Sequence, residues 1–482
     1  MIESTVWVAL PLTILTGGAF GLYVLARLLR LRNTHLAALT AGVFAVALLS
    51  LTPLFALVRA GAAPFFGAPT PGSAFLQADA AGLLLAAIAC GLGVAVALYS
   101  GHYISRDPRF ITYYPLLLML IAGMIGMLLA ADLFNLYLFC ELMSISAYVL
   151  VAFRRHTDTA IEAGFKYLVM GSVGTLIMLL GIAFVYRETG QLTLPLENGI
   201  PGPWRRAGIA CLLVGLGVKS AIVPLHTWLP DAYGRAPSSV SALLAAVISK
   251  STLILMLKAA LGLGLPAATL GLGLLLLSFL NMTLGNGLAL VQTHTKRLLA
   301  YSSIAQTGYI MFSLGIGLRY ELPAALQAGL FLLLTHAVMK ATAFLSKGVC
   351  HFYCNTTLVT ELRGTAQQLP LAALTFALSL AGLAGIPPLA GFVSKWFILT
   401  ECLRAADWLA YVGLAIFLLN SLLALGYYLP LIVQLFTPAP ARTGGAPARI
   451  GISPWMAVPL LTLAALIIAI GLYPGPWLAW VR

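Results

Sequence analysis

Charged side chains are scarce in this sequence. They make up 9% of its 482 residues, and only 14 residues are Asp or Glu. Soluble globular domains carry about 25% charged residues, so this composition excludes an ordinary soluble protein. Hydrophobic residues account for 61% of the chain instead. We therefore expect an all-α polytopic membrane protein, with the lipid bilayer as its surroundings.

The sequence also lacks the clustered ligands of a cofactor enzyme. Its six cysteines are scattered, and the densest group, Cys350-His351-x-x-Cys354, lacks the further ligands that a zinc site needs. Neither an iron–sulfur spacing nor a glycine-rich nucleotide loop is present. We expect no metal, no cofactor and no chemistry of the chain's own. The net charge of +13 lies in short loops between apolar runs, so nucleic acid is not an expected partner.

Apolar runs long enough to span a membrane recur along the chain. A spanning helix needs about 20 predominantly apolar residues, and this criterion predicts about fourteen spans. The first run is too long for the apolar core of a signal peptide and is expected to be retained. The predicted spans are 6–29, 37–59, 79–99, 113–131, 133–153, 163–186, 207–227, 238–263, 266–291, 299–318, 323–347, 370–402, 408–435 and 455–475.

Arginine and lysine in the short loops indicate the orientation. Loops after odd-numbered spans hold more of these residues than loops after even-numbered spans, which predicts that the odd loops are cytoplasmic. An even number of spans then places both termini on the outer face. We expect a multi-pass protein of the plasma membrane of a prokaryote.

Two predicted spans are interrupted. The seventh contains Gly215, Gly217 and Pro224, and the twelfth reads LAGLAGIPPLAGFVSKW. Proline breaks a helix, and a broken helix at membrane depth is tolerated only inside protein or beside water. Such breaks in corresponding positions of two halves are typical of transporters, so we predict two inverted five-helix repeats, spans 4–8 and 9–13. The expected parts are three N-terminal spans, two repeats, and a linker with the last span: residues 1–112, 113–265, 266–436 and 437–482.

Ionisable side chains lie inside several predicted spans. A charge near the bilayer centre costs roughly 2.5–3.5 kcal/mol on insertion scales, so each such residue is a functional-site candidate. Glu141 in span 5 and Lys219 in span 7 form a natural pair. The pair is either a structural contact between two helices or a proton-transfer pair that opens and closes. Lys250 in span 8 has no acidic residue in its own helix.

The later spans carry further candidates. His336 and Lys340 are four residues apart in span 11 and so share a helix face. Histidine titrates nearest to neutral pH and suits a relay, although a histidine bonded to a backbone carbonyl is the structural alternative. Lys395 follows the break in span 12, and His226 follows Pro224. We expect proton transfer along Glu141, Lys219, Lys250 and Lys395, with a secondary relay at His336, Lys340 and His226.

Four long motifs resemble a known family. HTWLPDAYGRAPSSVSALLAA, TKRLLAYSSIAQTGYI, HAVMKATAFL and LAGIPPLAGFVSKW are similar to signatures of the antiporter-like subunits of respiratory complex I, Mrp sodium/proton antiporters and membrane-bound hydrogenases. The resemblance covers about residues 113–430. It implies fourteen helices with inverted repeats, transport of protons or Na⁺, and other membrane subunits as partners. It also implies that Glu141, Lys219, Lys250 and Lys395 match the family's charged positions, with His336 and Lys340 at positions that are often polar.

The resemblance leaves the subtype open. The chain ends soon after span 14, without the long lateral helix of L-type subunits, and Lys395 stands where M-type subunits tend to carry glutamate. EAGFKYLVMGSVGTLIMLLGIAFVY looks N-like, whereas DLFNLYLFCELMSISAYVLV looks closer to D-type Mrp and hydrogenase members. A complex I-type subunit is the leading interpretation. The alternatives are a D-type subunit, a quinone-reducing oxidoreductase, a stand-alone antiporter and a structural subunit without transport, which the intramembrane charges argue against.

Overall fold

The computed structural model describes residues 2–67, 75–155, 157–196, 201–438 and 448–481, nearly all of them in helices or the turns between them. The chain forms two compact units from interleaved stretches of sequence. Unit 1 comprises Met1–Ala97, Asp107–Trp228 and Val247–Leu270. Unit 2 comprises Leu98–Arg106, Leu229–Ala246 and Gly271–Arg482.

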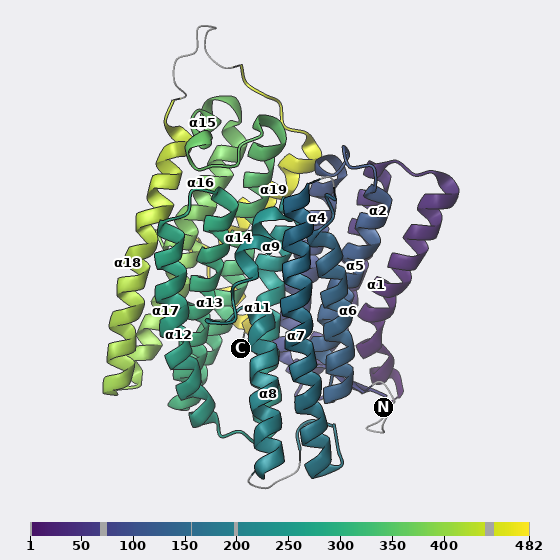
Figure 1. Cartoon of the computed structure of the whole chain (residues 1–482), viewed down its shortest axis with the longest axis vertical. Helices are drawn as coiled ribbons and strands as arrows, with labels where there is room; N and C mark the ends of the chain where they lie inside the picture. The colour runs from purple at the N-terminus through teal and green to yellow at the C-terminus, as the bar shows by residue number, and fades with distance from the viewer. Residues whose placement is uncertain (1, 68–74, 156, 197–200, 439–447, 482) are drawn as a thin grey trace. The chain divides into compact units, whose positions relative to one another are not determined.

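Unit 1 contains long helices and one short ribbon, in which Phe65 pairs with Gln77 across antiparallel strands. Figure 1 shows α7 and α8 side by side. Glycines allow this approach, because a Cβ at Gly215 would lie 2.5 Å from the Gly174 carbonyl oxygen. The elements are α1 (Ile2–Leu29), α2 (Asn33–Ser50), α3 (Thr52–Arg59), β1 (Phe65–Phe66), β2 (Leu76–Gln77), most of α4 (Ala80–Tyr103), α5 (Phe110–Leu129), α6 (Leu133–Val151), α7 (Asp158–Thr189), α8 (Pro203–Ser220) and α11 (Ser249–Gly262).

Unit 2 is organised around α14 (Pro323–Cys354), which packs against α13, α16, α17 and α19. Its buried face is therefore surrounded by helices of the same unit. The other elements are α9 (Leu229–Arg235), α10 (Ser238–Leu243), most of the π-helical turn η1 (Leu244–Ile248), most of α12 (Ala267–Leu290), α13 (Thr295–Arg319), the 3₁₀ turn η2 (Thr360–Leu362), α15 (Thr365–Gln368), α16 (Pro370–Ala384), α17 (Ala390–Arg404), α18 (Trp408–Phe436), α19 (Pro454–Leu472) and α20 (Gly475–Val481).

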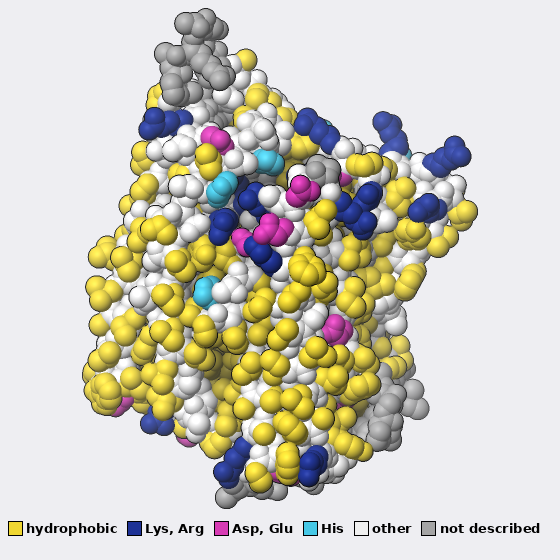
Figure 2. All heavy atoms as spheres, viewed as in Figure 1, with side chains coloured by type: hydrophobic (Ala, Val, Ile, Leu, Met, Phe, Trp, Pro, Cys, Tyr) yellow, Lys and Arg dark blue, Asp and Glu magenta, His cyan; other side chains and the backbone are white. Residues whose placement is uncertain are grey.

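The predicted spans all fall on helices. In the described part of the chain, eleven helices are long and apolar enough to cross a membrane. The remaining predicted spans fall on α8, on α13 and on the pair α16 and α17. Figure 2 shows hydrophobic side chains over most of the surface in view, as lipid contact requires. The helical membrane fold is confirmed, whereas the count of fourteen and the inverted repeats stay predictions. Much of the predicted linker, 439–447, lies outside the described residues.

Both predicted helix breaks are present. Residues 221–228 separate α8 from α9, and residues 385–389 separate α16 from α17. Each break begins with a residue in the left-handed conformation, Ala221 at φ 54° and Gly385 at φ 88°. A helix that ends in this way leaves carbonyl groups of its last turn without intrahelical donors. These carbonyls are available to side chains of the candidate site.

Candidate proton-transfer site

Lys219 lies in the last turn of α8, and its side chain is buried. Its Nζ donates hydrogen bonds to Ser144 Oγ at 2.6 Å and to Tyr148 Oη at 2.8 Å. Both acceptors belong to α6. Hydrogen bonds reduce the cost of burying an ammonium group. Lys219, next to the break in span 7, is thus bound by two neutral hydroxyl groups.

Glu141 lies on the same face of α6, one turn before Ser144 and two turns before Tyr148. Its carboxylate is half-buried, and Oε1 has no hydrogen-bond partner among the residues that the structure describes. No ion pair joins Glu141 to Lys219 in this part of the chain. The expected direct contact is therefore replaced by contacts to two hydroxyls next to Glu141, because Ser144 and Tyr148 reach the ammonium first.

Aromatic side chains connect Lys219 to the break in its own helix. Trp228 donates from Nε1 to the carbonyl oxygen of Val218 at 2.9 Å, which satisfies one of the open carbonyls of α8. Its ring stacks on Tyr167 with centroids 4.2 Å apart, and Tyr167 meets Tyr148 edge-on at 4.7 Å. A movement of Trp228 in the break would therefore be transmitted through Tyr167 to Tyr148, which accepts a hydrogen bond from Lys219. His226 lies half-buried within this break.

Lys250 is 0% exposed and is the second residue of α11, the helix that follows the π-helical turn η1. Its Nζ donates to Ser249 Oγ at 3.1 Å. Two residues later, Thr252 Oγ1 accepts a hydrogen bond of 3.0 Å from Ser220 Oγ, next to Lys219. Single π-helical turns are frequent at functional sites. The helices that carry Lys219 and Lys250 are thus joined by hydroxyl groups within unit 1.

His336 and Lys340 lie on α14 in unit 2, and both are 0% exposed. Lys340 Nζ donates to the carbonyl oxygen of Leu299 at 2.8 Å and to Ser302 Oγ on α13. Next to His336, the hydroxyl of Thr335 is 2.7 Å from that of Ser394 on α17. His336 and Lys340 are therefore both enclosed within unit 2, and Lys340 is bound to α13.

Lys395 lies on α17 and reaches back across the break. Its Nζ donates to the carbonyl oxygen of Ala384 at 3.1 Å, at the end of α16, and lies 5.0 Å from the centre of the Tyr309 ring. A cation is stabilised at a helix C-terminus because the helix dipole is negative there. Gly385 makes room for this contact, since a Cβ at that position would lie 3.1 Å from Lys395 Cδ.

Lys347 is a further buried lysine, 1% exposed, that was not among the residues predicted from the sequence. Its Nζ donates to the carbonyl and hydroxyl oxygens of Thr356, in the loop after α14. His351 Nδ1 lies 3.1 Å from the same carbonyl oxygen. The spacing along the helix could have predicted this residue. Positions 336, 340 and 347 are separated by four and seven residues and so lie on one helix face.

The buried lysines share one property. Lys219, Lys250, Lys340, Lys347 and Lys395 all donate to hydroxyl or carbonyl oxygens. Among the residues placed by the structure, no carboxylate forms an ion pair with Lys219, Lys250, Lys347 or Lys395. Neutral oxygens satisfy the hydrogen-bonding needs of a buried ammonium group without cancelling its charge. Unit 1 brings together the first three predicted residues, Glu141, Lys219 and Lys250, and unit 2 brings together the later ones, His336, Lys340 and Lys395.

Comparison with protein families identifies the chain. Residues 130–423 match the family described as NADH:quinone oxidoreductase/Mrp antiporter, transmembrane. The chain belongs to this family. The matched segment contains every buried site residue discussed above, from Glu141 to Lys395. The resemblance inferred from the motifs is therefore confirmed.

Relatives and solved structures agree with this assignment. Subunit N of the F(420)H(2) dehydrogenase of Methanosarcina mazei is 33% identical over 418 residues, covering 83% of each chain. Subunit N of the NADH-quinone oxidoreductase of Desulforamulus reducens is 33% identical over 390 residues, covering 80% of this chain and 79% of the relative. A chain of an archaeal membrane-bound sulfane sulfur reductase matches with TM-score 0.88 and 27% identity, over 98% of this chain and 96% of its own. A chain of Thermus thermophilus respiratory complex I matches with TM-score 0.77 and 29% identity, over 97% and 98%. The protein is thus an antiporter-like membrane subunit whose relatives are subunits of multi-subunit complexes.

Proposed function

We propose that this subunit translocates protons within an energy-converting complex of the NADH:quinone oxidoreductase type. The observation that carries the proposal is the set of buried lysines bound to neutral oxygens, two of them beside helix breaks. Burying a cation in a membrane span costs free energy, so these lysines are not explained by a contribution to stability. A relay needs such groups, since each must gain and lose a proton during a cycle.

Glu141 and Lys219 form the switch in this proposal. In the resting arrangement, Lys219 is bound to Ser144 and Tyr148. A shift of the break at residues 221–228 moves the end of α8 and brings the ammonium to Glu141, where the carboxylate favours the charged form. The return movement removes that stabilisation and passes a proton toward Lys250. Neighbouring subunits of the complex supply the movement.

The second half of the path lies in unit 2. Protons pass His336 and Lys340 and reach Lys395, which exchanges its proton at the break between α16 and α17. His226 takes a secondary part at the first break. The predicted orientation places the odd loops in the cytoplasm and both termini outside a prokaryotic plasma membrane.

A matched pair of lysine variants tests the proposal. Lys219→Met keeps an unbranched side chain of similar size and removes the charge, whereas Lys166→Met breaks an exposed ion pair with Glu162. In inverted membrane vesicles, donor oxidation by the complex should drive little dye-detected acidification with Lys219→Met and normal acidification with Lys166→Met. Assembly is checked by blue native electrophoresis. Normal acidification by an assembled Lys219→Met complex would refute the role.

The ion is tested in the same vesicles. We propose protons, and the alternative is exchange of Na⁺ for protons by a D-type subunit. Acidification that persists without Na⁺ supports the proposal. Acidification that requires a Na⁺ gradient, with no donor oxidation, would support the antiporter alternative.

A further inference from the structure

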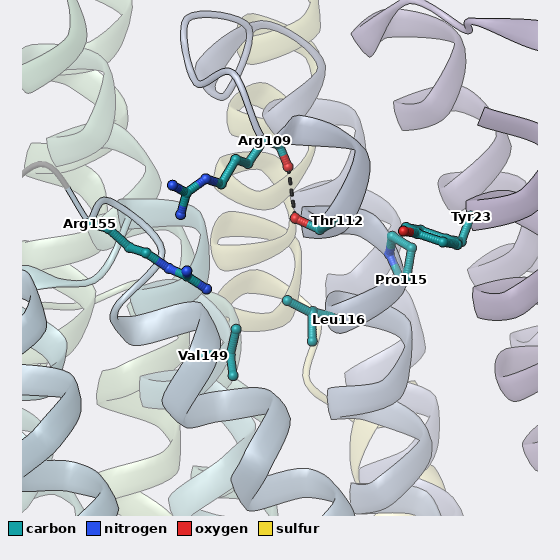
Figure 3. Close-up of a pocket in the computed structure, with 7 residues that line it drawn as sticks. All are labelled: Tyr23, Arg109, Thr112, Pro115, Leu116, Val149 and Arg155. Atoms are coloured by element: carbon teal, nitrogen blue, oxygen red, sulfur yellow. Dashed lines mark hydrogen bonds between the residues drawn. The ribbon is translucent and has the colours of Figure 1, made fainter. Parts of the chain in front are cut away.

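A cavity of about 420 Å³ lies at one end of α1, α5 and α6 in unit 1. Arg109 precedes α5 and Arg155 follows α6, so both loops meet at the same end of these helices. Figure 3 shows the two guanidinium groups turned toward one space, with Leu116 and Val149 below them in the view. The cavity therefore has a cationic rim and an apolar wall.

Neither Arg109 nor Arg155 makes a side-chain hydrogen bond or an ion pair with any residue that the structure describes. The neighbouring Arg154, by contrast, lies 3.4 Å from Asp107. A third cation, Arg27, donates to the hydroxyl of Tyr23 at 3.0 Å on the far wall. No carboxylate lines the cavity among these described residues, so it favours an anion.

The wall below the rim is suited to hydrocarbon. Pro115, Leu116 and Val149 line the cavity. The apolar surface continues along the helices, where Ile145 of α6 is 57% exposed and Phe20 of α1 is 68% exposed. A free phosphate ion would leave this wall uncovered, whereas a molecule with an anionic head and apolar tails would cover both parts.

We propose that this cavity binds an anionic phospholipid, with its phosphate between Arg109 and Arg155. Guanidinium groups match phosphate oxygens in charge and in geometry. An acyl chain lies along Pro115, Leu116 and Val149. The predicted cytoplasmic location of both loops places the site in the leaflet where anionic lipids attract basic residues. The lipid connects α1 to α6, the helix that carries Glu141.

The test compares two double variants of the intact complex. Arg109→Gln/Arg155→Gln removes both cations of the rim, and Arg30→Gln/Arg32→Gln removes two exposed arginines of the loop after α1 that do not line the cavity. The complex is placed in phosphatidylcholine nanodiscs that contain phosphatidylglycerol, and bound lipid is measured by native mass spectrometry. Each arginine in contact with the anionic head group contributes about 1 kcal/mol to its binding, so the rim variant, which removes two such contacts, should bind phosphatidylglycerol about 30-fold more weakly. The control should bind it as the wild type does.

A third variant separates the lipid from other occupants. Val149→Trp fills the apolar wall and keeps every charge, so it should also reduce phosphatidylglycerol binding. Equal binding by all variants would overturn the proposal. So would displacement of the lipid by an equal concentration of inorganic phosphate, or crosslinking of Arg155→Cys to a partner subunit that covers the cavity. Because no arm measures transport, failure here is distinct from failure of the proton-transfer proposal.

Discussion

The contact between Gly385 and Lys395 permits a quantitative prediction. Gly385 has φ 88°, and an added Cβ would lie 3.1 Å from Cδ and 3.4 Å from Nζ of Lys395. Gly385→Ala would therefore strain the backbone by about 1–2 kcal/mol and push the ammonium away from the Ala384 carbonyl. A hydrogen bond of a charged donor contributes about 1.5–3 kcal/mol. The expected loss in the free energy of unfolding is about 2.5–5 kcal/mol.

Gly190 provides the matched control. It has φ 66° at the end of α7, and no atom lies within 4 Å of its added Cβ. Gly190→Ala should therefore cost only the strain, about 1–2 kcal/mol. The assay is reversible unfolding of the purified chain by SDS in mixed micelles, together with donor-driven acidification by the assembled complex. Gly385→Ala should also slow acidification, whereas Gly190→Ala should not.

A double-mutant cycle isolates the contact. In a Lys395→Ala background, Gly385→Ala should cost no more than Gly190→Ala, because neither the crowded side chain nor its ammonium remains. The coupling between the two positions is then about 1.5–3 kcal/mol. Equal losses for Gly385→Ala and Gly190→Ala in the wild-type background would refute the reasoning, since the crowding of Lys395 would have no energetic effect.

Three further predictions concern other contacts. Tyr148→Phe removes one of the two acceptors of the buried lysine of α8 and should slow acidification in vesicles while leaving assembly unchanged; an unaltered rate would argue against a functional contact. Lys347→Met should expose the loop at Thr356 to faster hydrogen exchange, measured by mass spectrometry, because that loop loses two hydrogen bonds. The hydroxyl of Tyr320 holds the pKa of Asp407 below its usual range, so this stabilisation is present above the unfolded pKa of about 3.9 and is lost as pH falls through the lower folded pKa. Asp407→Asn should therefore flatten the acid limb of a melting-temperature profile, and an unchanged limb would contradict the assignment.

Much of the fold was accessible from the sequence because membrane insertion constrains it strongly. Apolar runs must form helices, since lipid offers no partner for backbone groups. The breaks at residues 221–228 and 385–389 were equally visible, because proline and glycine disrupt helices for local steric reasons. Each predicted segment accordingly falls on a helix.

The partners of the buried lysines were not accessible in the same way. Sequence order suggested Glu141 as the contact of Lys219, but Ser144 lies one turn further along α6 and accepts the hydrogen bond. Serine is common in helices, and nothing in its spacing separates an acceptor from a packing residue. The bond from Lys395 to the end of α16 depends on how the chain turns between two half-helices. That geometry is set by tertiary packing rather than by residue type.

The central claim is that protons pass through the subunit on its buried lysines. Lys250 tests it most directly, because it is 0% exposed and donates only to Ser249 among its described neighbours. Replacing it by Met removes a buried cation, so folding and assembly should not suffer. The measurement is the number of protons translocated per electron pair by the assembled Lys250→Met complex. The account predicts a lower ratio than in the wild type, and an unchanged ratio would contradict it.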